Sequence, residues 1–227
     1  MVELEQLQSL TGAQEILWKD LGSTREALQN NPNSQYLRRQ LVRDFATYVE
    51  AHTFYLKKVV LVVQQMLFQL IQLDSPLKAR LNEFFSMEFK SSEIQLLREQ
   101  NAEVDENGGV RSTTKYIQTT RNIRFAQAAY LRATKASFPV EYRSHGWAAL
   151  REVIVLRNRL THPKSKEDLI VTDEALENLI AANDWFRATS LGMTQAGNDK
   201  LEEFLSLLHT EIRKSAEDTT PNTRHAD

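Results

Sequence analysis

The sequence contains no cysteine, and it has only 7 glycines and 5 prolines among 227 residues. Without cysteine the chain can form no disulfide, no thiolate zinc site and no cysteine nucleophile, which fits a reducing compartment. Glycine and proline commonly end helices and strands, so their scarcity predicts long uninterrupted elements. Apolar residues recur at helical spacing along most of the chain. We therefore expect an all-α protein.

The chain also lacks an apolar run long enough to span a membrane. Its most apolar segment, residues 59–73, is interrupted by several glutamines. A bilayer requires about 20 consecutive apolar residues, so this segment is expected to be a buried core helix. Residues 1–5 are acidic and polar, unlike a signal peptide. These features predict a cytoplasmic protein with no membrane partner.

The formal net charge is −2, but the charges are unevenly distributed. Residues 111–166 contain 12 lysines or arginines and only 2 acidic residues, a surplus of +10, whereas the remainder carries −12. A basic segment of this kind can steer an anionic ligand to one face of a protein. Alternatively, the basic and acidic helices pair with each other, and composition alone leaves both options open.

Breaks in the apolar pattern divide the chain into expected helices. Residues 2–29 predict one or two modest helices, since Gly12 and Gly22 weaken the segment. Either Asn33 or Ser34 is expected to cap the next helix. The remaining helices are expected over residues 35–73, 77–85, 92–101, 114–137, 142–161 and 172–214, the last either continuous or interrupted near Gly192 and Gly197.

The clearest turn signal is the sequence Asp-Glu-Asn-Gly-Gly at residues 105–109. Asn-Gly favours the left-handed dihedral angles of a type I′ turn, so a small β-hairpin is expected around residues 102–113. Residues 215–227 lack an apolar anchor and are expected to form a disordered tail. The predicted organisation is an N-terminal helical extension over 1–31, a helical domain over 33–214 and this tail.

The most definite chemical signal is the sequence Arg-Asn-Arg-Leu-Thr-His-Pro at residues 157–163, where a helix is expected to end. An apolar stripe reaches Ile154, and Arg157 continues it one turn later. A guanidinium on such a stripe requires an anionic partner, because burying its charge alone is costly. Pro163 disfavours helical dihedral angles at His162. We expect His162 to leave the helix and turn back toward the Arg157 face.

An arginine and a histidine so placed suit the cleavage of RNA without a metal. Histidine can serve as a general acid or base near neutral pH. Arginine can bind a non-bridging phosphate oxygen and stabilise the charge that develops as a 2′-hydroxyl attacks phosphorus. The reaction needs proton transfer at both the attacking and the leaving oxygen, for which one histidine per chain is hardly enough. A two-fold dimer would supply a second histidine. The sequence has no metal-ligand pattern or phosphate-binding glycine loop, so no metal or cofactor is expected.

The pattern Arg157-Asn158-x-x-x-His162 resembles the RxxxxH signature of the HEPN superfamily, in which asparagine commonly follows the arginine. The arrangement of helices over residues 38–189 is also similar to that family. The resemblance implies an up-and-down helical bundle, a homodimer and metal-independent endoribonuclease activity, with Arg157 and His162 catalytic. It further implies that Asn158 supports or contacts the phosphate and that Glu50 lies near the site.

Members of this family are frequent in toxin–antitoxin and phage-defence systems, so the resemblance also implies an antitoxin or a defence partner. One toxin branch has a tyrosine two residues after the histidine, which its antitoxin modifies. This chain has Lys164 there, so that regulation is not expected. The helices before residue 38 and the hairpin have no counterpart in the minimal fold of the family.

Structural alternatives exist for each of these residues. In the first alternative, the sole role of Arg157 is a buried ion pair with Glu50 or another carboxylate. In the second, the sole role of His162 is to cap the helix. Arg159 is expected on a solvated face, with a supporting phosphate contact as the second option. His52, within an apolar stretch, is expected to be a satisfied helix histidine. The competing functions are a non-catalytic module that binds RNA or a nucleotide, and a helical interaction protein.

Overall fold

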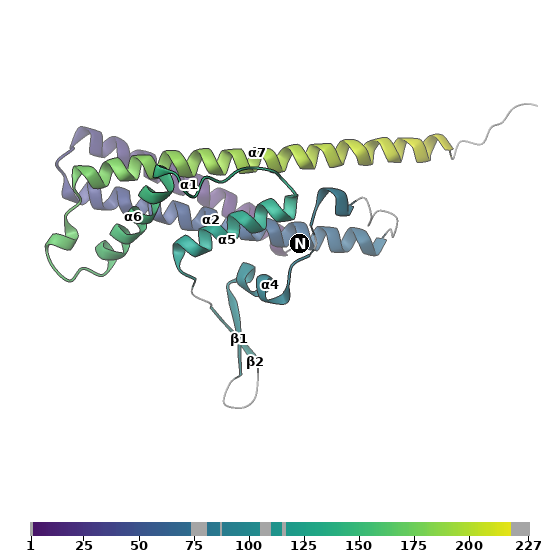
Figure 1. Ribbon diagram of the computed structural model, residues 1–227, viewed down its shortest axis with the longest axis horizontal. Coiled ribbons are helices and arrows are strands. Elements are labelled where there is room, and N and C mark those ends of the chain that lie inside the picture. The colour runs from purple at the N-terminus through teal and green to yellow at the C-terminus, as the bar shows by residue number, and fades with distance from the viewer. Residues whose placement is uncertain (1, 74–80, 87, 105–109, 115–116, 219–227) are drawn as a thin grey trace, which may run out of the picture.

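The protein is an all-α helical bundle with a small β-hairpin at its side (Figure 1). The structure is a computed structural model, and it describes residues 2–73, 81–86, 88–104, 110–114 and 117–218. None of the described helices is both long enough and apolar enough to cross a membrane.

Two long antiparallel helices form the base of the bundle. Helix α1 (Val2–Asn30) continues through both of its glycines, and α2 (Gln35–Leu73) has the bounds that the apolar pattern predicts. Ser34 caps α2, because its Oγ accepts a hydrogen bond from the Leu37 N–H at 3.3 Å. The long α2 contacts helices on several sides and is therefore the element that positions the candidate site.

A short helix and the hairpin follow α2. Residues 81–84 are helical, while residues 77–80 of the helix expected over 77–85 lie outside the described residues. Helix α4 (Ser91–Arg98) is followed at once by β1 (Gln100–Val104) and β2 (Val110–Thr114), which pair antiparallel. The predicted hairpin is confirmed, although its turn at residues 105–109 also lies outside the described part of the chain.

The next two helices begin later than the sequence predicts. Helix α5 (Thr119–Thr134) was expected from residue 114, which is wrong because Thr114 pairs across the hairpin with β1. Helix α6 (His145–Thr161) begins at the cap provided by Ser144, whose Oγ accepts from the Trp147 N–H at 3.3 Å. Both differences concern the starts of helices, so neither moves the motif at the end of α6.

The last helix, α7 (Asp173–Asp218), runs along α1 and α2 and extends beyond them (Figure 1). Thr172 caps it by accepting from the Ala175 N–H at 3.2 Å. The helix is continuous through Gly192, where a Cβ atom would overlap the Phe138 ring, so this glycine permits close packing. The expected disorder from residue 215 is wrong over 215–218, which are helical, and residues 219–227 lie outside the description.

The core consists of adjoining clusters along α2. One cluster joins α2 to α1, α6 and α7, with Phe45, Leu150 and Phe186 each at most 2% exposed. A second joins α2 to α4, α5 and α7 around Leu97 and Met193. Burial of such side chains contributes about 1.5–3 kcal/mol each. This packing fixes the C-terminal end of α6 and the start of α5 against the same side of α2.

Candidate functional site

Arg157 is the centre of the candidate site, and it lies one turn before the end of α6. Its guanidinium forms an ion pair with Glu50 of α2 through Nη2, and its Nη1 donates a hydrogen bond to Asn158 Oδ1 at 3.1 Å. The arginine side chain is 23% exposed, so it is half-buried but still reachable. Burial lowers the pKa of Arg157 from its ordinary value. A guanidinium nevertheless remains charged in proteins.

Glu50 joins three helices at this point. Besides pairing with Arg157 of α6, its carboxylate accepts a hydrogen bond from Thr119 Oγ1, at the first residue of α5, at 3.3 Å. Its side chain is 44% exposed, so the pair is open to solvent on one side. Three of the residues singled out from the sequence, Arg157, Asn158 and Glu50, are thus brought together by the fold.

His162 lies at the C-cap of α6, with φ −128° and ψ 62°, so it leaves the helix as the following proline predicts. Its backbone N–H still donates to the Asn158 carbonyl at 3.0 Å, which closes the last turn of the helix. The side chain is exposed. Within the described part of the chain, its imidazole makes no hydrogen bond or ion pair. It is therefore available to exchange a proton with a bound ligand.

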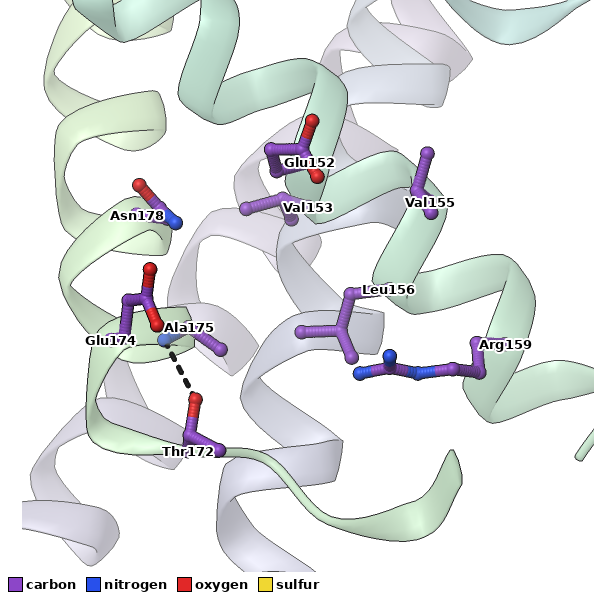
Figure 2. A pocket seen from close by; sticks show the side chains of 9 residues that line it. All are labelled: Glu152, Val153, Val155, Leu156, Arg159, Thr172, Glu174, Ala175 and Asn178. Atoms are coloured by element: carbon purple, nitrogen blue, oxygen red, sulfur yellow. Dashed lines mark hydrogen bonds between the residues drawn. The ribbon is translucent and has the colours of Figure 1, made fainter. Parts of the chain in front are cut away.

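Arg159 lies apart from Arg157, as two residues of helix rotate a side chain by about 200°. It borders a shallow cavity of about 180 Å³ between α6 and the start of α7, opposite Glu174 and Asn178 (Figure 2). Its Nε lies 3.9 Å from Asp168 Oδ1, a weak ion pair. The structure does not bring Arg159 to the Arg157 pair, in agreement with the expectation of a solvated face.

Of two arginines of α2 that the sequence analysis did not single out, Arg43 holds the end of the motif helix and Arg39 holds the segment that follows it. Arg43 donates from Nη2 to the Leu160 carbonyl at 3.2 Å, and Arg39 donates from Nη1 to the Leu169 carbonyl at 3.1 Å. The last carbonyls of a helix lack internal partners and carry partial negative charge, which a guanidinium compensates. The i, i+4 spacing of Arg39 and Arg43 predicts that they share one face of α2, but it does not predict which segment that face contacts.

The loop after the motif is anchored by Asp168 and is rich in cations. The Asp168 carboxylate accepts hydrogen bonds from the N–H groups of Lys164 at 2.8 Å and Ser165 at 3.1 Å. Lys164 and Lys166 are exposed there, close in sequence to the exposed His162. This end of α6 therefore presents several cations beside one titratable imidazole, a combination suited to holding and reacting with a phosphodiester.

Among the described residues, no group of three or more histidines and carboxylates is close enough to hold a metal ion. Comparisons of the chain with protein-family models, with curated proteins and with solved structures find no match.

Proposed function

We propose that this protein is a metal-independent endoribonuclease of the HEPN type, with its active site at the C-terminal end of α6. The observation that carries the proposal is the exposed, unpartnered His162 imidazole five residues after Arg157, whose guanidinium is oriented by Glu50 and Asn158. This arrangement supports acid–base chemistry next to a phosphate-binding cation.

In the proposed reaction, His162 accepts the proton of an RNA 2′-hydroxyl. The 2′-oxygen attacks the adjacent phosphorus, the bond from phosphorus to the 5′-oxygen breaks, and the leaving oxygen takes up a proton. The products are a 2′,3′-cyclic phosphate and a free 5′-hydroxyl. Arg157 stabilises the charge on a non-bridging oxygen. A second copy of the chain would supply a second imidazole as the general acid, so the proposal includes a homodimer.

The decisive experiment measures RNA cleavage in excess EDTA by the full chain and by His162→Ala. General acid–base catalysis contributes roughly 10²–10⁴-fold, so the variant should lose at least about 100-fold in rate. Its thermal midpoint should stay the same, because His162 is exposed and makes no side-chain bond. His209→Ala, an exposed histidine of α7, is the matched control and should cleave as the parent does.

A second function, binding of RNA or a nucleotide without cleavage, is favoured by one observation. Arg157 already has a carboxylate partner in Glu50, as a residue with a purely structural or binding role would. That function predicts salt-dependent RNA binding with no product from the parent or from His162→Ala. Equal cleavage by the parent and His162→Ala would instead contradict the proposed active site.

A further inference from the structure

A second cavity, of about 340 Å³, lies directly beside the Arg157–Glu50 pair. Helix α2 lines one wall with Glu50, Thr53 and Phe54, whose i, i+3, i+4 spacing places them on one face. The other lining residues come from the end of α4, the hairpin and the start of α5: Glu99, Thr114, Ile117, Thr119 and Asn122. Small-molecule sites are roughly 300–1,000 Å³ in volume, so the cavity is large enough for one ligand group.

A buried lysine binds the carboxylate at the polar end of this cavity. Lys57 Nζ donates to Glu99 Oε1 at 2.8 Å and to the Leu96 carbonyl at 3.3 Å, and its side chain is 0% exposed. Asn122 Nδ2 donates to the same Glu99 oxygen at 3.3 Å. The second carboxylate oxygen of Glu99 has no such bond among the described residues. It remains free to accept one from a ligand.

The amide of Asn122 adds a second unused acceptor. Because its Nδ2 donates to Glu99, its Oδ1 is the remaining atom, and this oxygen is buried without a hydrogen-bond partner. A buried polar atom without a partner costs roughly 1–3 kcal/mol, which a ligand that donates to it would recover. Less than 1 Å² of this oxygen is accessible, so a ligand reaches it only when the Asn122 side chain shifts. The Glu99 carboxylate, whose side chain is 28% exposed, is the acceptor already open, next to the apolar side chains of Phe54 and Ile117.

These acceptors select a ligand with donors rather than a metal ion. Each carboxylate of the cavity already faces a cation, Lys57 for Glu99 and Arg157 for Glu50, so a further cation gains little. A flat group with an apolar face and adjacent N–H donors satisfies both the acceptors and the apolar wall. Of the four RNA bases, only guanine places two adjacent donors, N1–H and the 2-amino group, on its Watson–Crick edge.

We infer that this cavity binds a guanine base of the RNA substrate, with Glu99 and Asn122 accepting from its Watson–Crick edge and the attached phosphate reaching Arg157. The inference rests on the proposed function, because it treats the cavity as the base subsite of the same active site. Phe54 and Ile117 contact the face of the base, and single-stranded bases are commonly bound in this way. The enzyme then cleaves next to guanine in unpaired RNA.

The test measures the affinity of the full chain for guanosine, inosine, adenosine and cytidine monophosphates by calorimetry, each as the 3′ and the 5′ isomer. A bidentate base contact discriminates by about tenfold or more, so the guanosine nucleotide should bind at least tenfold more tightly than those of adenosine or cytidine. Inosine monophosphate lacks the 2-amino group and should bind more weakly than guanosine monophosphate. Equal affinities for all four nucleotides would overturn the inference.

The variant that tests Glu99 must not fail merely by unfolding. Glu99→Gln alone leaves Lys57 without its counter-charge, so the double variant Lys57→Met/Glu99→Gln is measured as well. In both, Asn122 Nδ2 still holds the new amide oxygen, so an NH2 donor replaces the free acceptor and the preference for guanosine monophosphate should fall to within threefold. Glu93→Gln makes the same chemical change on α4 outside the cavity and should retain the preference. A double variant that folds and keeps the full preference would overturn the inference.

Cleavage of RNA by the parent separates this inference from the function on which it rests. A chain that cleaves in EDTA at all four bases equally is a ribonuclease without a guanine subsite. A chain that binds guanosine monophosphate selectively but never cleaves has the subsite and lacks the proposed activity. If both the proposed function and this inference hold, the parent cleaves only at guanine positions, and the double variant cleaves without that preference.

Discussion

In the middle of α2, the ionisable side chains on its two sides are in different states, although Arg38 near its start pairs with Asp173 of α7 at 2.7 Å. On the side toward α4, α5 and α6, Glu50 and Lys57 each pair with an opposite charge from another segment. On the side toward α1 and α7, His52 lies 5.4 Å from the Phe186 ring centroid, and its Nδ1 lies 3.0 Å from Gln14 Oε1. Burial lowers the pKa of His52 to about 4, so this imidazole is neutral at pH 7.

The difference at these positions follows from their neighbours, because Glu50 borders a cavity whereas His52 is buried among aromatic rings. Where α2 borders a cavity, its charges are retained because each has a partner, and one pair stays partly exposed. Where α2 is buried against α1 and α7, no counter-charge faces His52 among the described residues. Its Nδ1 has a partner in Gln14, but its Nε2 is buried without one, so the expectation of a fully satisfied histidine is wrong. Changes on the first side should therefore act through unbalanced charge, and protonation of His52 on the second side should act through the cost of a buried charge without a partner.

The largest effect is expected from breaking the buried pair of the first side. Glu99→Gln leaves the fully buried Lys57 without its counter-charge. Burial already lowers the pKa of Lys57, while its bond to Glu99 opposes that shift. Removing one partner of a buried pair typically costs 3–5 kcal/mol, and the free energy of unfolding in urea at pH 7 should fall by about 3 kcal/mol.

The double variant Lys57→Met/Glu99→Gln sharpens this result. Replacing a buried ion pair with uncharged groups of similar volume is often neutral or stabilising. The free energy of unfolding should therefore return to within about 1 kcal/mol of that of the parent. If Glu99→Gln alone were as stable as the parent, Lys57 would not depend on Glu99, and the two sides of α2 would not differ as described.

A smaller effect is expected from titrating His52 on the other side. Its pKa is about 4 in the folded protein and 6.5 in the unfolded chain, so the unfolded state binds the proton first as the pH falls. Stability from the neutral ring is complete above pH 6.5 and is lost progressively down to about pH 4. Between pH 7 and pH 5 the loss should be about 2 kcal/mol, measured by urea unfolding at each pH.

His52→Gln removes the titrating group and should remove this part of the pH dependence, whatever its effect on stability at pH 7. The exposed His209 offers the matched control, and His209→Gln should unfold with the same pH dependence as the parent. An unchanged pH profile in His52→Gln would show that carboxylates alone cause the acid sensitivity.

The parts of the fold that sequence predicted depend on local signals. The bounds of α2 follow from its apolar stripe and from Ser34, and the hairpin follows from Asn-Gly at residues 107–108. The exit of His162 from α6 follows from the proline after it. In each case the deciding residues lie within one or two turns of the feature. The start of α5 was missed because pairing of Thr114 across the hairpin overrode the helical pattern.

The parts of the site that the sequence did not predict depend on contacts between distant segments. Lys57 and Glu99 are 42 residues apart in sequence, and Glu99 ends α4 in the left-handed region with φ 55°. A glutamate is uncommon in that conformation, so no local pattern predicts that its carboxylate faces α2. Arg43 likewise meets the end of α6 across 117 residues. Resemblance to a family placed Glu50 near Arg157, but it could not have found the cavity beside them.

The smallest effect is expected from the exposed pair on the first side. In Glu50→Gln the amide oxygen can still accept from Arg157 and Thr119, so the contacts are kept and only the charge is lost. Because Glu50 is 44% exposed, water screens the pair, and the free energy of unfolding should fall by less than about 1 kcal/mol. The difference from the parent should shrink further in 1 M salt. A loss as large as that of Glu99→Gln would mean that both pairs on this side serve folding, and that Arg157 is not held ready for a phosphate.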